Sequence, residues 1–163
     1  MKPIIALATV VAAASLALPV SAQNAGQIAR VRGGASCPGC NLFQGDFSGL
    51  EKAGLNLSGS RLRQSDLSLA VMNRTNFSGA DMRDVEAYGG VFSSSNFRRA
   101  NLTNASFVGT YLEGSNFSGA TLAGVNFSGA QLARATGLTQ SQLNQACGDE
   151  ATILPRALHI PAC

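Results

Sequence analysis

A large apolar residue recurs at nearly every fifth position between residues 40 and 134, and this spacing constrains the fold more than any other feature of the sequence. The segment divides into nineteen consecutive five-residue blocks without an insertion. Seven of the eight Phe residues occupy the block centre, where random placement would put about one in five. These are Phe47, Phe77, Phe92, Phe97, Phe107, Phe117 and Phe127. Because a five-residue step turns about 140° around a helix and makes no apolar stripe, the pattern excludes an amphipathic helix.

The composition of a block predicts how its five residues lie. Residues two apart in an extended chain point to the same side, so the block centre and the residue two before it can both face inward. The first residue of a block, two before the centre, is often small, as at Ala100 and Ala120. It would fill a narrow interior beside a large side chain at the centre. Gly and Ser are frequent in the last two places, where they favour a tight corner. The blocks therefore predict a solenoid whose coils lie about 4.8 Å apart, the spacing of neighbouring strands.

Blocks such as ADMRD (80–84), ANLTN (100–104) and VNFSG (125–129) resemble the pentapeptide-repeat family, whose loose consensus is A-(D/N)-(L/F)-x-x. The resemblance implies an all-β solenoid, a right-handed four-sided β-helix that completes one coil every four blocks. Two block centres depart from the family pattern. Lys52 would bring an ammonium group into an apolar column unless the chain bulges or the side chain reaches solvent. Ala87 would leave a gap in a column of Phe residues, so the register near these two positions is open.

The start of the chain has the composition of an export signal. A single Lys, an apolar run, a Pro and small residues up to Ala22 predict a secretory signal peptide over residues 1–22. The apolar run falls short of the ~20 residues that span a bilayer, so no stable membrane span is expected after cleavage. The rest of the chain is expected to divide into an N-terminal cap segment (23–39), the solenoid (40–134) and a C-terminal cap (135–163).

The C-terminal cap is expected to contain a short helix followed by an extended tail. Thr139 is a candidate N-cap, Gln142 follows three residues later, and Gly148 is a candidate stop. The tail is apolar and contains two prolines, which favour an extended path across the last coil. Such a cap would cover the apolar cross-section that a solenoid exposes at its end.

The cysteines fall into two pairs, one near each end of the predicted solenoid. In an oxidising compartment they can form disulfides, and bridged Cα atoms must lie within about 7 Å of each other. We therefore predict the bridges Cys37–Cys40 and Cys147–Cys163. A zinc site that also uses His159 is less favoured, because the two ends should lie about 20 Å or more apart while zinc ligands converge within about 2.3 Å of one ion. No metal and no other cofactor is expected.

Charge and residue types narrow the class of function. Without the signal segment the chain has eleven basic and nine acidic residues, so neither a polybasic nucleic-acid surface nor an acidic mimic of one is indicated. The single histidine, His159, lies in the tail, and the register assembles no Ser–His–Asp or His–Cys set, so an enzyme is not expected. The sequence predicts a rigid non-catalytic scaffold, or a protein- or polymer-binding surface, of a periplasmic or secreted protein.

Two alternatives stay open beside the binding scaffold. The family resemblance implies one of them, a DNA-mimicking regulator of a topoisomerase, although that role uses an acidic surface inside the cytoplasm. The other is an enzyme of unknown type. The sequence predicts no particular oligomeric state.

Arg98 and Arg99 are the candidate binding residues. Four blocks per coil would make the outward positions of one face small and polar, and only one of its rungs carries two arginines. The planar guanidinium group recognises carboxylates and phosphates in a bidentate manner. An anionic envelope polymer or an unidentified protein is therefore the expected partner. The alternative is a solvated pair of charges that keeps a nearly neutral protein soluble.

Overall fold

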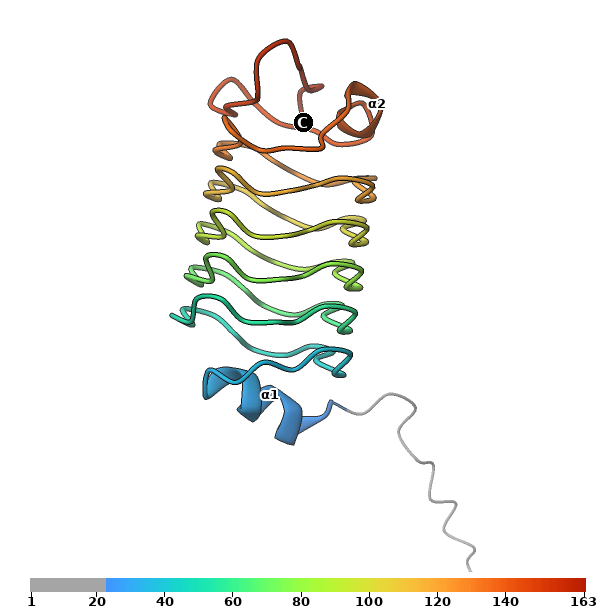
Figure 1. Ribbon diagram of the computed structural model, residues 1–163. Helices are drawn as coiled ribbons and strands as arrows, with labels where there is room; N and C mark the ends of the chain where they lie inside the picture. Colours follow the sequence, from blue (N-terminus) through green and yellow to red (C-terminus); the bar gives the residue numbers. More distant parts are fainter. Residues whose placement is uncertain (1–22) are drawn as a thin grey trace, which may run out of the picture.

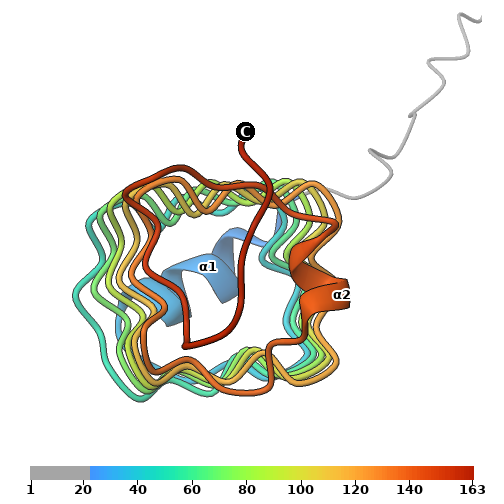
Figure 2. The ribbon, with the colours of Figure 1, turned by 90° about the horizontal axis from the view of Figure 1, so that it is seen from above.

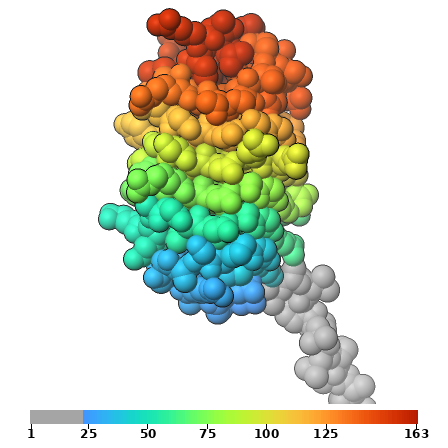
Figure 3. Space-filling view, in the orientation of Figure 1, coloured from blue at the N-terminus to red at the C-terminus, as the bar shows by residue number. Residues whose placement is uncertain are grey.

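The computed structural model describes residues 23–163, so the predicted signal peptide, residues 1–22, lies outside the described residues. The described chain winds into a stack of four-sided coils, with α1 (Ala25–Arg32) against the first coil and α2 (Gln140–Leu143) at the last (Figures 1 and 2). In Figure 2, seen from the C-terminal end, the chain runs anticlockwise as it approaches the viewer, which is a right-handed winding. The coils appear as successive bands in the space-filling view (Figure 3).

Four blocks complete one coil. Parallel bridges join residues twenty apart, from Asn41↔Arg61 near the N-terminus to Tyr111↔Gln131 near the other end. The backbone N–H of Arg61 donates to the oxygen of Cys40 at 2.8 Å, so neighbouring coils hydrogen-bond as adjacent strands do. We call the four sides face 1 to face 4; they begin with the segments 40–44, 45–49, 50–54 and 55–59 and continue every twenty residues.

The corners of the coil are tight turns at the last two positions of each block. The N–H of Gly45, for example, donates to the oxygen of Leu42 at 2.9 Å. The fifth residue of every block before the last has a positive φ, which glycine adopts without strain and other residues reluctantly. Eight of these positions nevertheless hold a side chain: Gln44, Gln64, Leu69, Arg74, Asp84, Ser94, Arg99 and Asn104.

The interior is a set of apolar columns, as the sequence predicts. Every block centre except Lys52 is buried, including Ala87, whose N–H still donates to the next coil, at Ser106, over 2.8 Å. The ring of Phe97 stacks on Phe77 and on Phe117, each with centroids 5.1 Å apart and planes 9° apart. The gap expected at Ala87 therefore does not disturb the register.

Lys52 does not make the chain bulge. Its N–H donates to the oxygen of Val71 at 3.0 Å, and the N–H of Gly54 donates to Asn73 at 2.8 Å, so the ladder is regular on both sides. The Lys52 side chain is exposed, with its methylene groups close to Gly34. The charged group thus reaches solvent at the open end of the solenoid, which is the second of the two outcomes considered from the sequence.

The N-terminal cap contains a helix, α1, that the sequence analysis did not predict. The side chain of Asn24 accepts from the N–H of Gln27 at 3.1 Å and caps the helix, and Val31 is fully buried against the core. The disulfide Cys37–Cys40 follows directly, with Cα atoms 5.5 Å apart. The N–H of Cys37 donates to Asn56 in the coil above, so this bridge lies where the cap becomes the solenoid.

The C-terminal segment covers the end of the solenoid and also continues its backbone hydrogen-bond ladder. Helix α2 begins after Thr139, with both hydrogen bonds of the capping box to Gln142, but it ends at Leu143, well before Gly148. It ends early because the chain returns to the coil, where Cys147 pairs with Asn126. The disulfide Cys147–Cys163, with Cα atoms 4.8 Å apart, then fixes the tail across the last coil.

Candidate functional site

Face 4 presents a ladder of asparagine side chains with fixed orientation. The Nδ2 of Asn96 donates to Oδ1 of Asn76 at 3.1 Å, and Nδ2 of Asn76 donates to Oδ1 of Asn56 at 3.3 Å. The Oδ1 of each of the three asparagines also accepts the backbone N–H two residues later, as Asn96 accepts from Arg98 at 3.1 Å. Because each amide is held from two sides, the ladder forms a regular polar edge beside the corner that follows it.

Arg98 and Arg99 lie at that corner, between face 4 and face 1, and both are exposed. Together with Ser78, Gly79 and Asn96 they line a shallow depression of about 360 Å³. The N–H of Arg99 donates to the coil above at 3.0 Å, although its φ of 54° is one that a side chain rarely adopts. The two adjacent arginines thus line a depression that the sequence alone does not show.

Glycines leave room around the Arg99 side chain. Gly79 lies one coil before Arg99 and Gly119 one coil after it at the same position of the block. A Cβ atom at Gly119 would lie 3.6 Å from Cγ of Arg99, so the arginine stem runs close beside this backbone. Gly79 and Gly119 occupy a block position that holds a side chain at other corners, as at Leu69 and Asn104. The sequence reveals that these glycines flank Arg99 only when residues twenty apart are aligned.

Some other arginines of the solenoid are paired with carboxylates, whereas, among the residues that the structure describes, Arg98 and Arg99 are not. Arg83 contacts Asp81 at 2.7 Å and Arg134 contacts Glu113 at 2.7 Å. The hydrogen bond from Arg83 lowers the pKa of Asp81, and the bond to Glu113 raises the pKa of Arg134. Within residues 23–163, neither Arg98 nor Arg99 forms an ion pair, so both charges are available to a ligand.

Face 2 carries a column of three carboxylates, two of which accept hydrogen bonds from the serine two residues later. Asp46, Asp66 and Glu86 are bridged in succession. The hydroxyl and N–H of Ser48 bind Asp46 and lower its pKa, and the N–H of Ser68 donates to Asp66 at 2.8 Å. In the described part of the chain, no three His, Cys, Asp or Glu side chains are grouped so that they could hold a metal ion.

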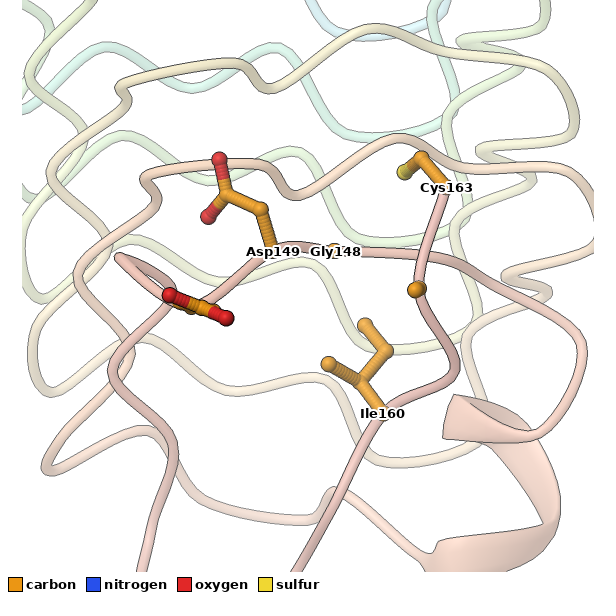
Figure 4. Close-up of a pocket in the computed structure, with 6 residues that line it drawn as sticks. Gly148, Asp149, Ile160 and Cys163 are labelled. Carbon is orange, nitrogen blue, oxygen red and sulfur yellow. The ribbon is translucent and has the colours of Figure 1, made fainter.

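The C-terminal cap contains a second depression, of about 430 Å³ (Figure 4). It is lined by Gly148, Asp149, Glu150, Ile160, Ala162 and Cys163. The carboxylate of Asp149 accepts from the N–H of Gly129 at 2.8 Å and from Thr152 at 3.0 Å, and chiefly the first bond lowers its pKa. Asp149 thus fixes the tail to the last coil. His159 is held by hydrogen bonds between its backbone and Gln140, and it is not among the residues of the depression.

The chain belongs to the pentapeptide-repeat family, because the family model for pentapeptide repeats matches more than half of it. Eight copies are found, over residues 53–86, 95–134 and 111–147. No curated protein sequence is significantly similar to the chain as a whole. None of the helices seen between residues 23 and 163 has the length and apolar character that crossing a bilayer requires.

Several solved structures are similar to this chain. HetL of the cyanobacterium Nostoc sp. strain PCC 7120, involved in heterocyst differentiation regulation, is 20% identical, with a TM-score of 0.52 over 79% of this chain and 61% of that one. Rfr23 of the cyanobacterium Cyanothece 51142 is 22% identical, with a TM-score of 0.38 over 79% and 97%. QnrB1, a plasmid-mediated fluoroquinolone resistance protein, is 21% identical, with a TM-score of 0.40 over 76% of each chain. The chain thus spans less than two thirds of HetL, and the likeness to HetL, at 20% identity, speaks for the fold alone.

Proposed function

We propose that the protein is an exported, non-catalytic scaffold of the cell envelope that binds an anionic polymer at the Arg98–Arg99 corner. One observation carries this proposal: two exposed guanidinium groups without ion pairs line one depression beside an ordered amide ladder. Paired arginines fit the carboxylate or phosphate groups of a polymer, and the regular rungs match a ligand with repeating charges.

The remaining features fit a rigid binding surface. The backbone is hydrogen-bonded from coil to coil, and a disulfide ties the chain at each end of the stack. Disulfides persist outside the reducing cytosol, which agrees with the export signal expected in the sequence. The polar side chains of both depressions include no nucleophile beside a base, so the proposed role is binding rather than catalysis.

The surface gives less support to a mimic of DNA that regulates a topoisomerase. Such a mimic needs a long run of negative charge, but the acidic column of face 2 ends at Glu86. The next two rungs of that column are Ser106 and Asn126, which are neutral. The whole chain also has a net charge of +3, opposite in sign to a nucleic acid.

The test is titration of the protein with inorganic polyphosphate and with a polycarboxylate, followed by calorimetry. The double variant Arg98→Ala, Arg99→Ala should bind at least about tenfold more weakly at low salt, because two charge-assisted contacts are lost. The matched control Arg30→Ala, Arg156→Ala removes the same charge from exposed positions elsewhere and should bind nearly as well as the parent. High salt should weaken the parent strongly. Equal losses in the two double variants would show that the corner is not the binding site.

A further inference from the structure

One column of outward side chains is apolar. The second residue of each block points outward, and on faces 1, 2 and 4 of the repeat region this position is polar throughout. On face 3 it holds Val71, Val91 and Tyr111 on three successive coils, joined by parallel bridges. Tyr111 is 53% exposed. The column therefore presents apolar surface to solvent on three coils of face 3.

The apolar surface extends around the corner between faces 2 and 3. Leu69 and Tyr88 lie there and are 61% and 56% exposed. The N–H of Leu69 donates to the oxygen of Tyr88 at 2.8 Å, so the two residues are on neighbouring coils, and the Leu69 side chain lies close to Gly89, two residues before Val91. We call the five residues the apolar patch: Leu69, Val71, Tyr88, Val91 and Tyr111. Contiguous apolar surface of this kind marks an interaction site.

We propose that the apolar patch pairs two copies of this chain, face 3 against face 3, with the order of the coils reversed. A two-fold axis that passes beside Val91 generates this arrangement. Val71 of one copy then faces Tyr111 of the other, and the two Tyr88 rings lie near the axis. The contact is isologous, because the same patch serves on both copies.

Charge complementarity selects this arrangement over a parallel one. Arg74 is exposed and forms no ion pair among the residues described, and it lies two coils away from Glu113 on the same face. Reversal of the coil order places Arg74 of each copy beside Glu113 of the other, twice in the dimer. Glu113 already binds Arg134 through Oε1, and its side chain is 43% exposed, so a second cation can approach.

The ends of face 3 support the same choice. Reversed coils place Glu51 opposite Gln131, which is neutral, because both occupy the second position of their blocks, two coils from Val91 on either side. Parallel coils would instead place Glu51 opposite Glu51 of the second copy, and like charges directly opposite each other are destabilising. The parallel arrangement would also leave Arg74 without a carboxylate partner.

The size of the patch indicates a reversible dimer. Its three coils cover about 10 Å along the solenoid at the strand spacing, so the contact is smaller than the roughly 800 Å² per partner of a standard stable interface. The Arg98–Arg99 corner, between faces 4 and 1, lies diagonally across the coil from the corner that carries Tyr88. Pairing through the apolar patch therefore leaves both Arg98–Arg99 corners open, and the dimer would bind a polymer in a bivalent manner.

Sedimentation equilibrium of the protein, from about 1 to 500 μM, tests the pairing, since contacts of this size associate in that range. The double variant Val91→Asn, Tyr111→Asn should keep the fold, because asparagine already occupies the second position of the blocks on face 4. Its association constant should fall at least about tenfold. The matched control Thr121→Asn, on face 1, should associate like the parent. If the parent stays monomeric over the whole range, the proposal is wrong. This holds also if the apolar patch of such a monomer is found to bind a different protein.

A charge exchange tests the reversed order of the coils. Arg74→Glu alone and Glu113→Lys alone should each associate more weakly than the parent, because each creates two like-charge contacts in its own dimer. An equimolar mixture of the two variants should regain association, because both contacts between the variants are then of opposite charge. Native mass spectrometry would show the mixed dimer. If the mixture associates no better than the separate variants, while circular dichroism shows both to be folded, the reversed arrangement is wrong.

Discussion

Replacement of Phe97 by alanine should destabilise the protein more than most single changes, because this ring lies at the centre of the aromatic core. It is fully buried, stacks on the Phe residues twenty positions before and after it, and meets Phe92 and Phe107 edge to face. A buried Phe→Ala change costs about 3–5 kcal/mol. Aromatic pairs contribute about 0.5–1.5 kcal/mol each beyond area burial, so the four contacts place the cost near the top of that range, at about 5 kcal/mol.

The matched control is Phe43→Ala, which removes the same side chain from the Phe outside the block centres. Phe43 is half-buried, and the guanidinium of Arg61 lies 4.9 Å from its ring centroid. Loss of this exposed cation–π contact should cost about 1 kcal/mol. Each kcal/mol shifts Tm by roughly 3 °C at this chain length, so thermal unfolding followed by circular dichroism should show a loss of roughly 15 °C for Phe97→Ala and roughly 3 °C for Phe43→Ala. Similar losses in the two variants would refute the inward register.

Three further predictions concern the C-terminal cap. The double variant Cys147→Ala, Cys163→Ala opens a bridge of sequence separation 16 and should lose about 3 kcal/mol, and a reductant should abolish its difference in Tm from the parent. Folding lowers the pKa of Asp149 from 3.8, so the carboxylate stabilises the fold above about pH 4, and this stabilisation is lost as the pH falls through the folded pKa. The variant Asp149→Asn should therefore show a smaller loss of unfolding free energy than the parent between about pH 6 and pH 2. Gln142→Ala removes the capping box and two bonds to backbone oxygens of the last full coil, and should raise amide hydrogen exchange in α2 at least about tenfold.

The inside of the solenoid was predictable from the sequence, because it depends on a strict local period. Each block centre needed only the five-residue spacing, and the corner at residues such as Gly49 needed only turn chemistry. The capping box at Thr139 and Gln142 was likewise a local signal. Pairing of the cysteines followed from the length of the stack, since the ends of the solenoid are too far apart to be bridged.

The ends and the surface were less predictable, for physical reasons. Helix α1 has only eight residues and is stabilised largely by packing of Val31 on the first coil, so the local signal from Asn24 was weak without that context. The path of Lys52 depended on the space beside Gly34, which the sequence alone does not place next to it. Surface sites arise from residues twenty apart, and so the Arg98–Arg99 depression and the apolar patch emerge only when the register of all four faces is known.

Site-specific photo-cross-linking in the producing cells would test the proposed binding scaffold most directly. A photoreactive residue at Ser78, which lines the Arg98–Arg99 depression, keeps both arginines intact. The matched control carries the same residue at Thr103, which occupies the same block position on face 1 and is also half-buried. We predict an adduct with a phosphate- or carboxylate-bearing polymer of the envelope from position 78 and none from position 103. Equal adducts from both positions, or an adduct from position 103 alone, would contradict the account.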